Sequence, residues 1–250
     1  MTQSTYQPIS RLDGKVAVII GGAGAIGEAT ARHFAALGAR VALVHRSDDP
    51  ARTQPILQSL SGTGHKFYTA SVTDSASLKA VAAQIQADMG PANILVNSAG
   101  FTQPVPLNDL EALSDELIDS IFQVNWRGVF ASIRAFTPQM KTAQDAVVIN
   151  VSSIAAFTGV GSNLAYAAAK AGVDLLTKSL AKALAPQIRV LAVSPGVVDS
   201  AFVPGRGADF NDKAAATIPL KRIGHVEDTA SAIEACATTM RFATGSRFVV

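Results

Sequence analysis

The chain has 250 residues, with 21 Lys and Arg against 19 Asp and Glu and a formal net charge of +2. Only 16% of the residues are charged and 48% are hydrophobic. A chain of this length and composition can bury a large core, which excludes intrinsic disorder. Its longest run of basic residues is Lys221-Arg222, so we do not expect nucleic acid as a partner.

The single cysteine, Cys236, excludes a disulfide framework and a Cys-based zinc site, and it suits a reducing cytoplasm. Residues 1–15 are polar and lack the pattern of a signal peptide. The longest uncharged window, 146–169, contains Asn150, Asn163 and several Ser and Gly residues, so it does not predict a lipid-exposed helix. We expect a cytoplasmic protein with no membrane partner and one domain, 1–250.

Short apolar runs alternate with longer Ala-rich segments along the chain. The runs are 15–20, 40–44, 65–70, 93–97, 146–151, 188–194 and 248–250. Each is continuously apolar, as in parallel strands that are covered on both faces. Amphipathic segments between them include 28–37, 75–89, 113–136 and 164–184. The pattern predicts an α/β fold, a Rossmann-like doubly wound parallel sheet of about seven strands with helices on both faces.

One long segment of unclear structure, 197–219, is rich in Gly, Pro and Ala and is typical of a substrate lid. In a doubly wound sheet, ligands bind beyond the carboxyl ends of the strands, near the point where the strand order reverses. We therefore expect the functional residues directly after the strands.

A glycine-rich turn follows the first predicted strand. Small residues there let the backbone approach a pyrophosphate, and the next helix directs free N–H groups at it. Gly-x-Gly-x-x-Gly fits Gly22, Gly24 and Gly27, whereas Gly-x-x-x-Gly-x-Gly fits Gly21, Ala25 and Gly27 with Ala in the middle place. We prefer the second because Gly21 directly follows the strand; a purely structural turn is the competing interpretation. The expected dinucleotide contacts are Gly21, Gly24, Ala25, Ile26 and Gly27.

The second predicted strand ends in Val44-His45-Arg46-Ser47, without the carboxylate that would favour NAD by binding the adenosine ribose. The planar guanidinium of Arg46 suits a 2′-phosphate instead. We therefore expect NADP(H) to be favoured, with NAD(H) possible. A solvated surface position is the alternative for Arg46, and His45 would either stack on the adenosine or be exposed.

Chemistry-bearing side chains cluster around the fifth strand and the helix 164–184. Tyr166 and Lys170 are four residues apart and share one helix face. Ser153 follows the strand 146–151. Asn125 lies within the helix 113–136, an unfavourable place for Asn unless its side chain is used. Asn97 to Gly100 end the fourth strand with small residues, where a nicotinamide ribose would lie.

These residues resemble the motifs of the short-chain dehydrogenase/reductase family, and the resemblance extends from Lys15 to Val250. It implies that Tyr166 is the general acid/base, that Lys170 lowers its pKa and binds the nicotinamide ribose, that Ser153 polarises the substrate oxygen and that Asn125 holds a relay water. Pro195-Gly196 resembles the family's signature after the sixth strand, with Ser200 where a Thr usually contacts the cofactor. Further expected cofactor contacts are Ser71, Val72, Asn97, Ala99, Gly100, Tyr166, Lys170, Pro195, Gly196, Val198 and Ser200.

General acid/base catalysis near neutral pH requires the pKa of the Tyr166 phenol to fall far below its usual value. A free phenol has a pKa of about 10, so the pKa has to fall by roughly 3 units. Lys170 and the positive charge of a nicotinamide both favour phenolate and would supply this fall. No Gly-x-Ser-x-Gly elbow occurs and the four histidines lack ligand spacing, so we expect neither a serine hydrolase nor a metal site.

The sequence thus predicts an NADP(H)-preferring oxidoreductase that interconverts a ketone and a secondary alcohol. Apolar residues near the carboxyl edge suggest an apolar pocket, and Arg206 is the single candidate for binding a substrate carboxylate. A 3-oxoacyl thioester, a small cyclic ketone and a sugar stay open as substrates. The suggested pocket residues are Val105, Phe157, Val160, Val198 and Phe202.

A non-catalytic dinucleotide-binding sensor or scaffold is the alternative function, because fold does not imply function. The intact set of Asn, Ser, Tyr and Lys counts against it, since a pure binder has no need of the phenol. The Ala-rich helices 113–136 and 164–184 have enough apolar surface to cover the sheet and pair with a second copy. The family commonly forms oligomers in this way, so a homodimer or homotetramer is expected.

Overall fold

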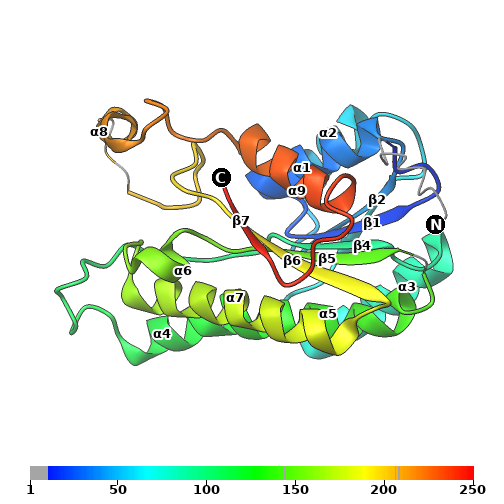
Figure 1. Cartoon of the computed structure of the whole chain (residues 1–250), viewed down its shortest axis with the longest axis horizontal. Coiled ribbons are helices and arrows are strands. Elements are labelled where there is room, and N and C mark those ends of the chain that lie inside the picture. Colours follow the sequence, from blue (N-terminus) through cyan, green and yellow to red (C-terminus); the bar gives the residue numbers. More distant parts are fainter. Residues whose placement is uncertain (1–10, 144, 206, 208) are drawn as a thin grey trace, which may run out of the picture.

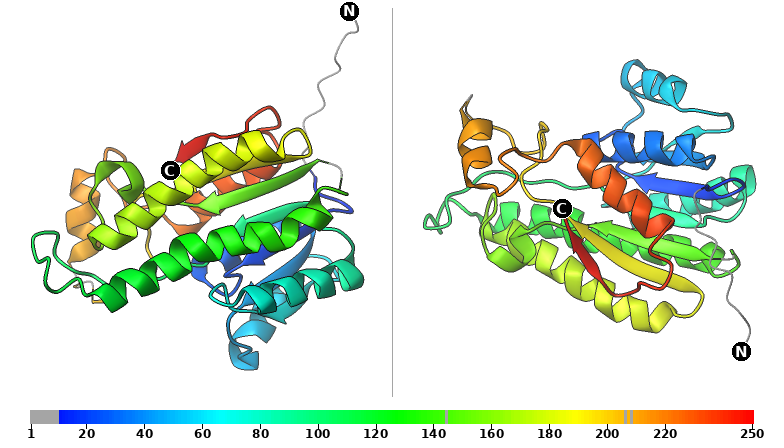
Figure 2. Two further views of the ribbon diagram at one scale, coloured as in Figure 1. Left: turned by 90° about the horizontal axis from the view of Figure 1, so that it is seen from below. Right: turned by 45° about the horizontal axis from the view of Figure 1, so that its top comes forward.

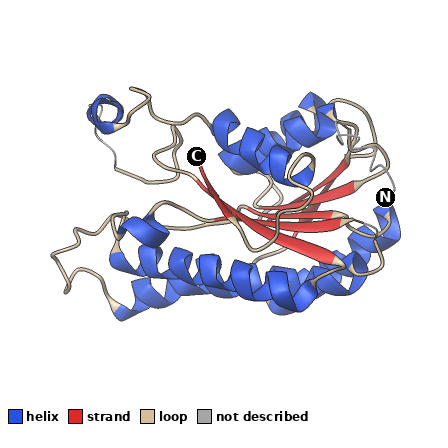
Figure 3. Cartoon of the chain, in the orientation of Figure 1, coloured by secondary structure: helices blue, strands red, loops and turns tan. Residues whose placement is uncertain are grey.

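The computed structural model describes residues 11–143, 145–205, 207 and 209–250. Seven strands form one sheet in the order β3-β2-β1-β4-β5-β6-β7, and every pair is parallel (Figure 3). The predicted fold class is confirmed, and each predicted strand boundary lies within one residue of the observed one. The strands are β1 Val16–Ile20, β2 Arg40–His45, β3 Lys66–Thr69, β4 Ile94–Asn97, β5 Ala146–Val151, β6 Ile188–Ser194 and β7 Arg247–Val249.

Helices cover both faces of this sheet (Figure 1). One layer contains α1 Ala25–Ala36, α2 Pro50–Ser59 and α9 Val226–Ala237. The other contains α3 Ser75–Met89, α4 Asp115–Phe122, α5 Gly128–Met140 and α7 Leu164–Leu184. The short helices α6 Ala155–Thr158 and α8 Phe210–Thr217 follow β5 and β6. Within the described residues, no helix is long and apolar enough to cross a membrane.

The central strands are apolar throughout because each face of the sheet has its own core. Along β1, Val16, Val18 and Ile20 belong to the cluster that holds α3, α5 and α7. The alternate residues, Ala17 and Ile19, belong to the cluster that holds α1, α2 and α9. A strand with two buried faces has no solvent side to place polar residues on, which explains the continuous apolar pattern.

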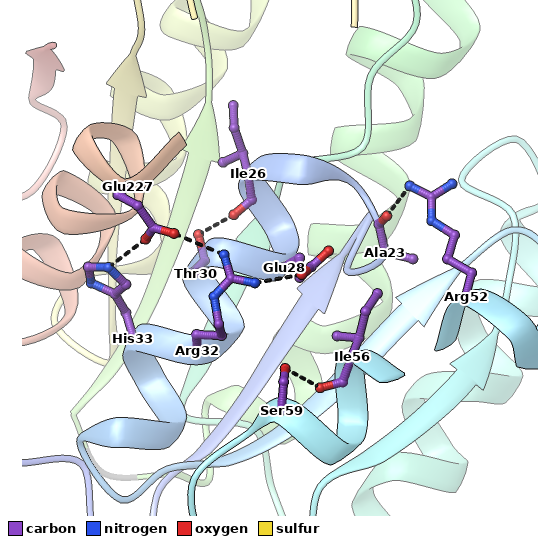
Figure 4. Close-up of polar contacts among 10 residues, drawn as sticks. All are labelled: Ala23, Ile26, Glu28, Thr30, Arg32, His33, Arg52, Ile56, Ser59 and Glu227. Atoms are coloured by element: carbon purple, nitrogen blue, oxygen red, sulfur yellow. Dashed lines mark hydrogen bonds and ion pairs between the residues drawn. The ribbon is translucent and has the colours of Figure 1, made fainter. Parts of the chain in front are cut away.

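One ionic network fastens α9 to α1, and Figure 4 shows the part of it that Glu28, Arg32, His33 and Glu227 form. The guanidinium of Arg32 pairs with Glu28 at 2.5 Å and with Glu227 at 2.9 Å. The ring of His33 lies between Glu227, at 3.0 Å, and Glu234, at 2.7 Å. These contacts hold the C-terminal helix beside the helix that follows the glycine turn.

The predicted helix 113–136 is wrong as a single element. α4 ends at Phe122, a π-helical turn, η1 (Gln123–Arg127), follows, and α5 then continues to Met140. The segment 197–219 is also not all loop, because it contains α8. Figures 1 and 2 show α8 (orange) and the loop before α4 (green) at the same end of the molecule, beyond the carboxyl ends of the strands.

Candidate active site

The glycine turn lies where the strand order reverses, between β1 and β4. Gly21 has a φ of +82° and its N–H donates to the Val44 carbonyl at 2.8 Å. A Cβ at Gly21 would lie 2.6 Å from the backbone nitrogen of Ala99, and a Cβ at Gly27 would collide with the Gly21 carbonyl. Ala25, by contrast, is exposed. The geometry therefore favours the pattern of Gly21, Ala25 and Gly27.

The N-terminus of α1 points its free donors into this turn. Its N-cap, Gly24, has no side-chain cap among the described residues, whereas α2, α3, α4 and α7 are capped by Asp49, Asp74, Ser114 and Asn163. The first intrahelical bond runs from the Glu28 N–H to the Gly24 carbonyl at 2.8 Å. The N–H groups of Ala25, Ile26 and Gly27 are thus left for an anion, so the site fits a pyrophosphate.

A shallow hollow lies beside the turn. It brings three predicted cofactor contacts together, Val72 after β3 and Asn97 and Ala99 from the end of β4, with Ile20, Val124, Gly128 and Val129 completing the lining. The side chain of Asn97 is already engaged, because it donates to Asn150 at 2.8 Å and accepts from Ser132 at 2.5 Å. Its role here is to position the end of β4.

Ser71 follows β3 and its hydroxyl bonds to that of Thr73 at 2.8 Å. The same hydroxyl accepts from the Thr73 N–H at 3.3 Å, and the Ser71 N–H donates to the Ser77 hydroxyl at 3.3 Å. The turn after β3 therefore closes on itself next to the hollow, and it holds Ser71 in place beside Val72.

A cationic corner lies at the end of β2. His45 ends the strand, Arg46 follows it exposed, and Arg52 of α2 donates to the Ala23 carbonyl of the glycine turn (Figure 4). Burial lowers the pKa of His45, and the nearby charges of Arg52 and Arg46 lower it further. Arg52 was missed from the sequence; Asp49 and Pro50, a helix cap and a first-turn proline, were the signal for its helix.

Ser153, Tyr166 and Lys170 come together at the carboxyl end of β5. Ser153 follows β5, and its hydroxyl is near enough to the Tyr166 hydroxyl to lower the pKa of that phenol. Lys170 is 3% exposed, and its ammonium lies 5.6 Å from the centre of the Tyr166 ring. That ammonium donates to the Val151 carbonyl at 2.8 Å. The predicted juxtaposition of hydroxyl, phenol and ammonium is present.

Burial dominates the electrostatics of Tyr166 and Lys170. Burial raises the pKa of Tyr166 to about 12, against a smaller lowering by the Ser153 hydroxyl. Burial also lowers the pKa of Lys170 to about 8, and the charge of Asp174 opposes this. The protein's own groups therefore hold the phenol protonated at neutral pH, and the fall in pKa that catalysis requires does not come from Lys170 alone.

Asn125 lies in the π-helical turn rather than in a regular helix. Its amide nitrogen donates to the carbonyls of Phe101 at 2.7 Å and Ile121 at 2.9 Å, and its oxygen accepts from the Phe101 N–H at 3.3 Å. Because this side chain takes backbone partners, it widens the helix locally. Asn125 thereby fixes the loop after β4, next to Gly100.

The chain after β6 closes the site from the opposite side. Pro195 accepts from the Ile154 N–H at 3.1 Å, and the Gly196 N–H donates to the Val250 carbonyl at 2.8 Å. Val198 bridges to Gly224, and Ser200 follows, half-buried. Further along, the ring of Phe202 lies 6.0 Å from that of Tyr166. Arg206 lies outside the described residues.

Asn163, which sequence reasoning did not single out, connects this site to the loop after β4. Its side chain accepts from the Tyr166 N–H at 2.7 Å and donates to the Gln103 carbonyl at 2.7 Å. An Asn three residues before Tyr166 is a helix-cap signal that could have revealed it. Among the described residues, no group of three or more His, Cys, Asp or Glu side chains could hold a metal ion.

The strand order of the parallel sheet reverses at the glycine turn, and a Ser-Tyr-Lys trio lies at the same edge of the sheet. Together these features define a dinucleotide-dependent oxidoreductase. The model of the short chain dehydrogenase family matches residues 15–209. The chain belongs to the short-chain dehydrogenase/reductase family.

Known proteins are similar to this chain over most of its length. It is 34% identical to the 2,3-dihydro-2,3-dihydroxybenzoate dehydrogenase of Bacillus subtilis, covering 89% of this chain and 88% of the relative. It is also 34% identical to the 3-oxoacyl-acyl-carrier-protein reductase FabG of Thermotoga maritima, covering 89% and 90%. A solved short-chain dehydrogenase/reductase from Burkholderia xenovorans matches with a TM-score of 0.89 at 30% identity, covering 94% and 96%.

Proposed function

We propose that the protein is an NADP(H)-preferring enzyme that interconverts a ketone and a secondary alcohol, with Tyr166 as the general acid/base. The observation that carries this proposal is the trio of half-buried Ser153 and buried Tyr166 and Lys170, at the same edge of the sheet as the glycine turn. In this proposal the whole chain is one dinucleotide-binding and catalytic unit, and 197–219 is its substrate lid.

The protein's residues hold the substrate and move one proton. The hydroxyls of Ser153 and Tyr166 bind the carbonyl oxygen, and Tyr166 donates its proton to that oxygen in the reductive direction. Because burial keeps the phenol protonated, the proton is in place before reduction begins. When bound, the nicotinamide supplies or accepts the hydride. Lys170 favours the phenolate that remains, since an adjacent cation stabilises it.

The preference for NADP(H) rests on the cationic corner at the end of β2. Arg46 and Arg52 both act on His45, so two guanidinium groups lie close to the place expected for the adenosine ribose. Guanidinium groups suit a phosphate better than a neutral hydroxyl. Replacing Arg46 with Ala should lower the ratio of NADPH to NADH affinity roughly tenfold, the loss of one charge-assisted bond.

The substrate is expected to carry its carbonyl on an apolar group. Phe202 lies against Tyr166, and Phe157 and Val160 are 45% and 66% exposed at the same edge of the sheet. Two relatives, by their names, act on a ring diol and on a 3-oxoacyl thioester. Cyclic ketones and 3-oxoacyl thioesters are therefore the substrates to test first.

The test is a panel of such carbonyl compounds, followed by the loss of NADPH absorbance. Tyr166→Phe should reduce turnover by at least about a hundredfold, the usual contribution of a general acid, and should leave NADPH affinity unchanged. Tyr68→Phe is the matched control, because Tyr68 donates to Asp88 at 2.9 Å and lies in the core with α3. Undiminished turnover in Tyr166→Phe, or no turnover of any carbonyl by the wild type, would contradict the proposal.

We also propose that the protein pairs with a second copy through α4, α5 and α7. Phe122, Trp126 and Phe130 are each 36–37% exposed, and Leu175 of α7 is 65% exposed. The rings of Trp126 and Phe130 stack at 6.3 Å. Apolar surface of this kind marks interfaces. Leu175→Glu should lower the mass measured by light scattering, whereas Leu220→Glu, at a 78% exposed site, should not.

A cytoplasmic location is part of the same proposal. Cys236 is a free, buried thiol, and burial raises its pKa to about 12, which suits a protein kept in a reducing compartment. Cell fractionation of the native source would test this, and recovery with membranes or in the medium would contradict it.

A further inference from the structure

Lys170 is a buried cation in an environment with few compensating charges. Lys170 is 3% exposed, and its ammonium donates to the neutral carbonyl of Val151. Removing an ammonium from water strongly favours its neutral form. A lysine that has to stay charged in such a place therefore needs a nearby anion.

Asp174 lies four residues further along the same face of α7. Its side chain is 9% exposed. One carboxylate oxygen, Oδ2, accepts from the Arg247 guanidinium at 2.7 Å. The other, Oδ1, is buried and has no hydrogen-bond partner among the described residues. The Asp174 carboxylate therefore has one oxygen that Arg247 does not bind.

Arg247, the first residue of β7, binds this carboxylate from another element of the fold. Its guanidinium carbon lies 4.0 Å above the centre of the Phe157 ring of α6, and its side chain is 32% exposed. The contact connects β7 to α6 and α7, the two helices that follow Ser153 and carry Tyr166. Arg247 therefore both fixes Asp174 and partly neutralises it.

Other charged groups on the elements around α7 are turned elsewhere. Arg189 of β6 donates to the Met240 carbonyl at 3.0 Å, and Arg127 of η1 donates to the Thr73 carbonyl at 3.4 Å. The carboxylates of α4, Asp115, Glu116 and Asp119, are exposed. Asp174 is the one charged group of the described residues that acts appreciably on Lys170.

We propose that Asp174 is a positioning residue that keeps the Lys170 ammonium protonated, and that Arg247 limits how strongly it does so. The proposal rests on the function proposed above for Lys170. The proposal predicts that removing Asp174 and removing Arg247 change the pKa of Lys170 in opposite directions. If the ion pair were purely structural, removing either partner would only lower the stability of the protein, because a buried charge would be left unpaired.

The decisive experiment measures the protonation of Lys170 without any need for turnover. Protein carrying lysine labelled with ¹³C at Cε is titrated by NMR, and the Lys170 signal is assigned by its loss in Lys170→Met. In Asp174→Asn the midpoint should fall by about one pH unit, the low end of the effect of an adjacent opposite charge. In Arg247→Met, which keeps an apolar stem over Phe157, it should rise.

Two controls separate this role from a general loss of structure. Asp88→Asn breaks a carboxylate contact with Tyr68 and Lys66 in the layer of α3 and should leave the Lys170 midpoint unchanged. Arg247→Lys should restore the wild-type midpoint. Thermal melts of all variants check that they are folded. An unchanged midpoint in Asp174→Asn, or a fall in both single variants, would overturn the proposal.

Kinetics provide a second, separate readout. Activity that depends on charged Lys170 is present below its pKa and falls as the pH rises through it, so the alkaline limb of kcat/KM should move to lower pH in Asp174→Asn and to higher pH in Arg247→Met. If the NMR midpoints move as expected but no carbonyl compound is turned over, the proposed function fails while the coupling of Asp174 to Lys170 stands. If the midpoints do not move, the coupling fails whatever the activity.

Discussion

Replacing Gly21 with Ala tests how closely the turns after β1 and β4 approach each other. The added Cβ would lie 2.6 Å from the nitrogen and 2.8 Å from the Cα of Ala99, and backbone cannot rotate away as a side chain can. Overpacking of this kind costs about 1–3 kcal/mol. The φ of +82° adds about 1–2 kcal/mol, because L residues avoid the left-handed region. We expect the free energy of unfolding to fall by about 3 kcal/mol in total.

Gly14→Ala is the matched control. Gly14 has a φ of +76°, but a Cβ there would meet nothing within 4 Å. Gly14→Ala therefore introduces the backbone strain without the collision. In both variants Ala lowers the conformational entropy of the unfolded chain by the same amount, so this effect cancels in the comparison. The difference between the two variants isolates the steric part, about 1–3 kcal/mol.

Urea unfolding followed by the fluorescence of Trp126, the one tryptophan of the chain, measures both variants. NADPH titration of the folded variants adds a functional readout, because a displaced turn should weaken NADPH binding in Gly21→Ala and not in Gly14→Ala. If Gly21→Ala is no less stable than Gly14→Ala at an equal m value, the close approach of the two turns is refuted.

Three further predictions concern α7 and its surroundings. Asn163→Ala removes the cap of α7 and should lower stability by about 1 kcal/mol and turnover with it, measured by urea unfolding and initial rates. Burial raises the pKa of Tyr166 to about 12. Because the unfolded phenol ionises near pH 10, stability should decline between about pH 10 and 12, and less so in Tyr166→Phe. Gly172→Ala puts a Cβ 2.6 Å from the Trp126 indole and should expose that ring, seen as a red-shifted emission.

The strands were predictable because each carries its own signal. β5 and β6 have the predicted bounds, and their residues are almost all buried. Continuous apolar runs of this length need no tertiary information to be recognised. The bounds of α3 and α7 were also predicted correctly, because the amphipathic pattern continues over the full length of each helix.

The interruption of the helix 113–136 was not predictable from periodicity. η1 forms because the Asn125 amide bonds to Phe101, twenty-four residues earlier in the chain, as well as to Ile121. A contact between distant segments leaves no periodic trace. The sequence showed only that Asn125 was out of place in a regular helix, and the structure places it in the π-helical turn.

Arg52 shows a second kind of failure. Its side chain reaches the Ala23 carbonyl from α2, a helix with few buried residues and a weak apolar pattern. An exposed arginine in an unrecognised helix cannot be assigned to a site without knowing which loop faces it. Arg46 directly follows a strand, so the topology alone places it at the carboxyl edge of the sheet.

The buried stripe of α7 carries the strongest argument for function. Asn163, Tyr166, Lys170, Asp174 and Thr177 follow one another at spacings of three or four residues, and each is at most 9% exposed. A helix normally fills such a stripe with apolar side chains, because burying polar groups costs free energy unless each finds a partner. Here partners come from other elements, such as Gln103 before α4, Val151 of β5 and Arg247 of β7. Asn163 is explained by stability, because it caps α7. At the interior positions of Tyr166, Lys170 and Asp174 stability alone would favour apolar side chains, so these three are best explained by the chemistry they support.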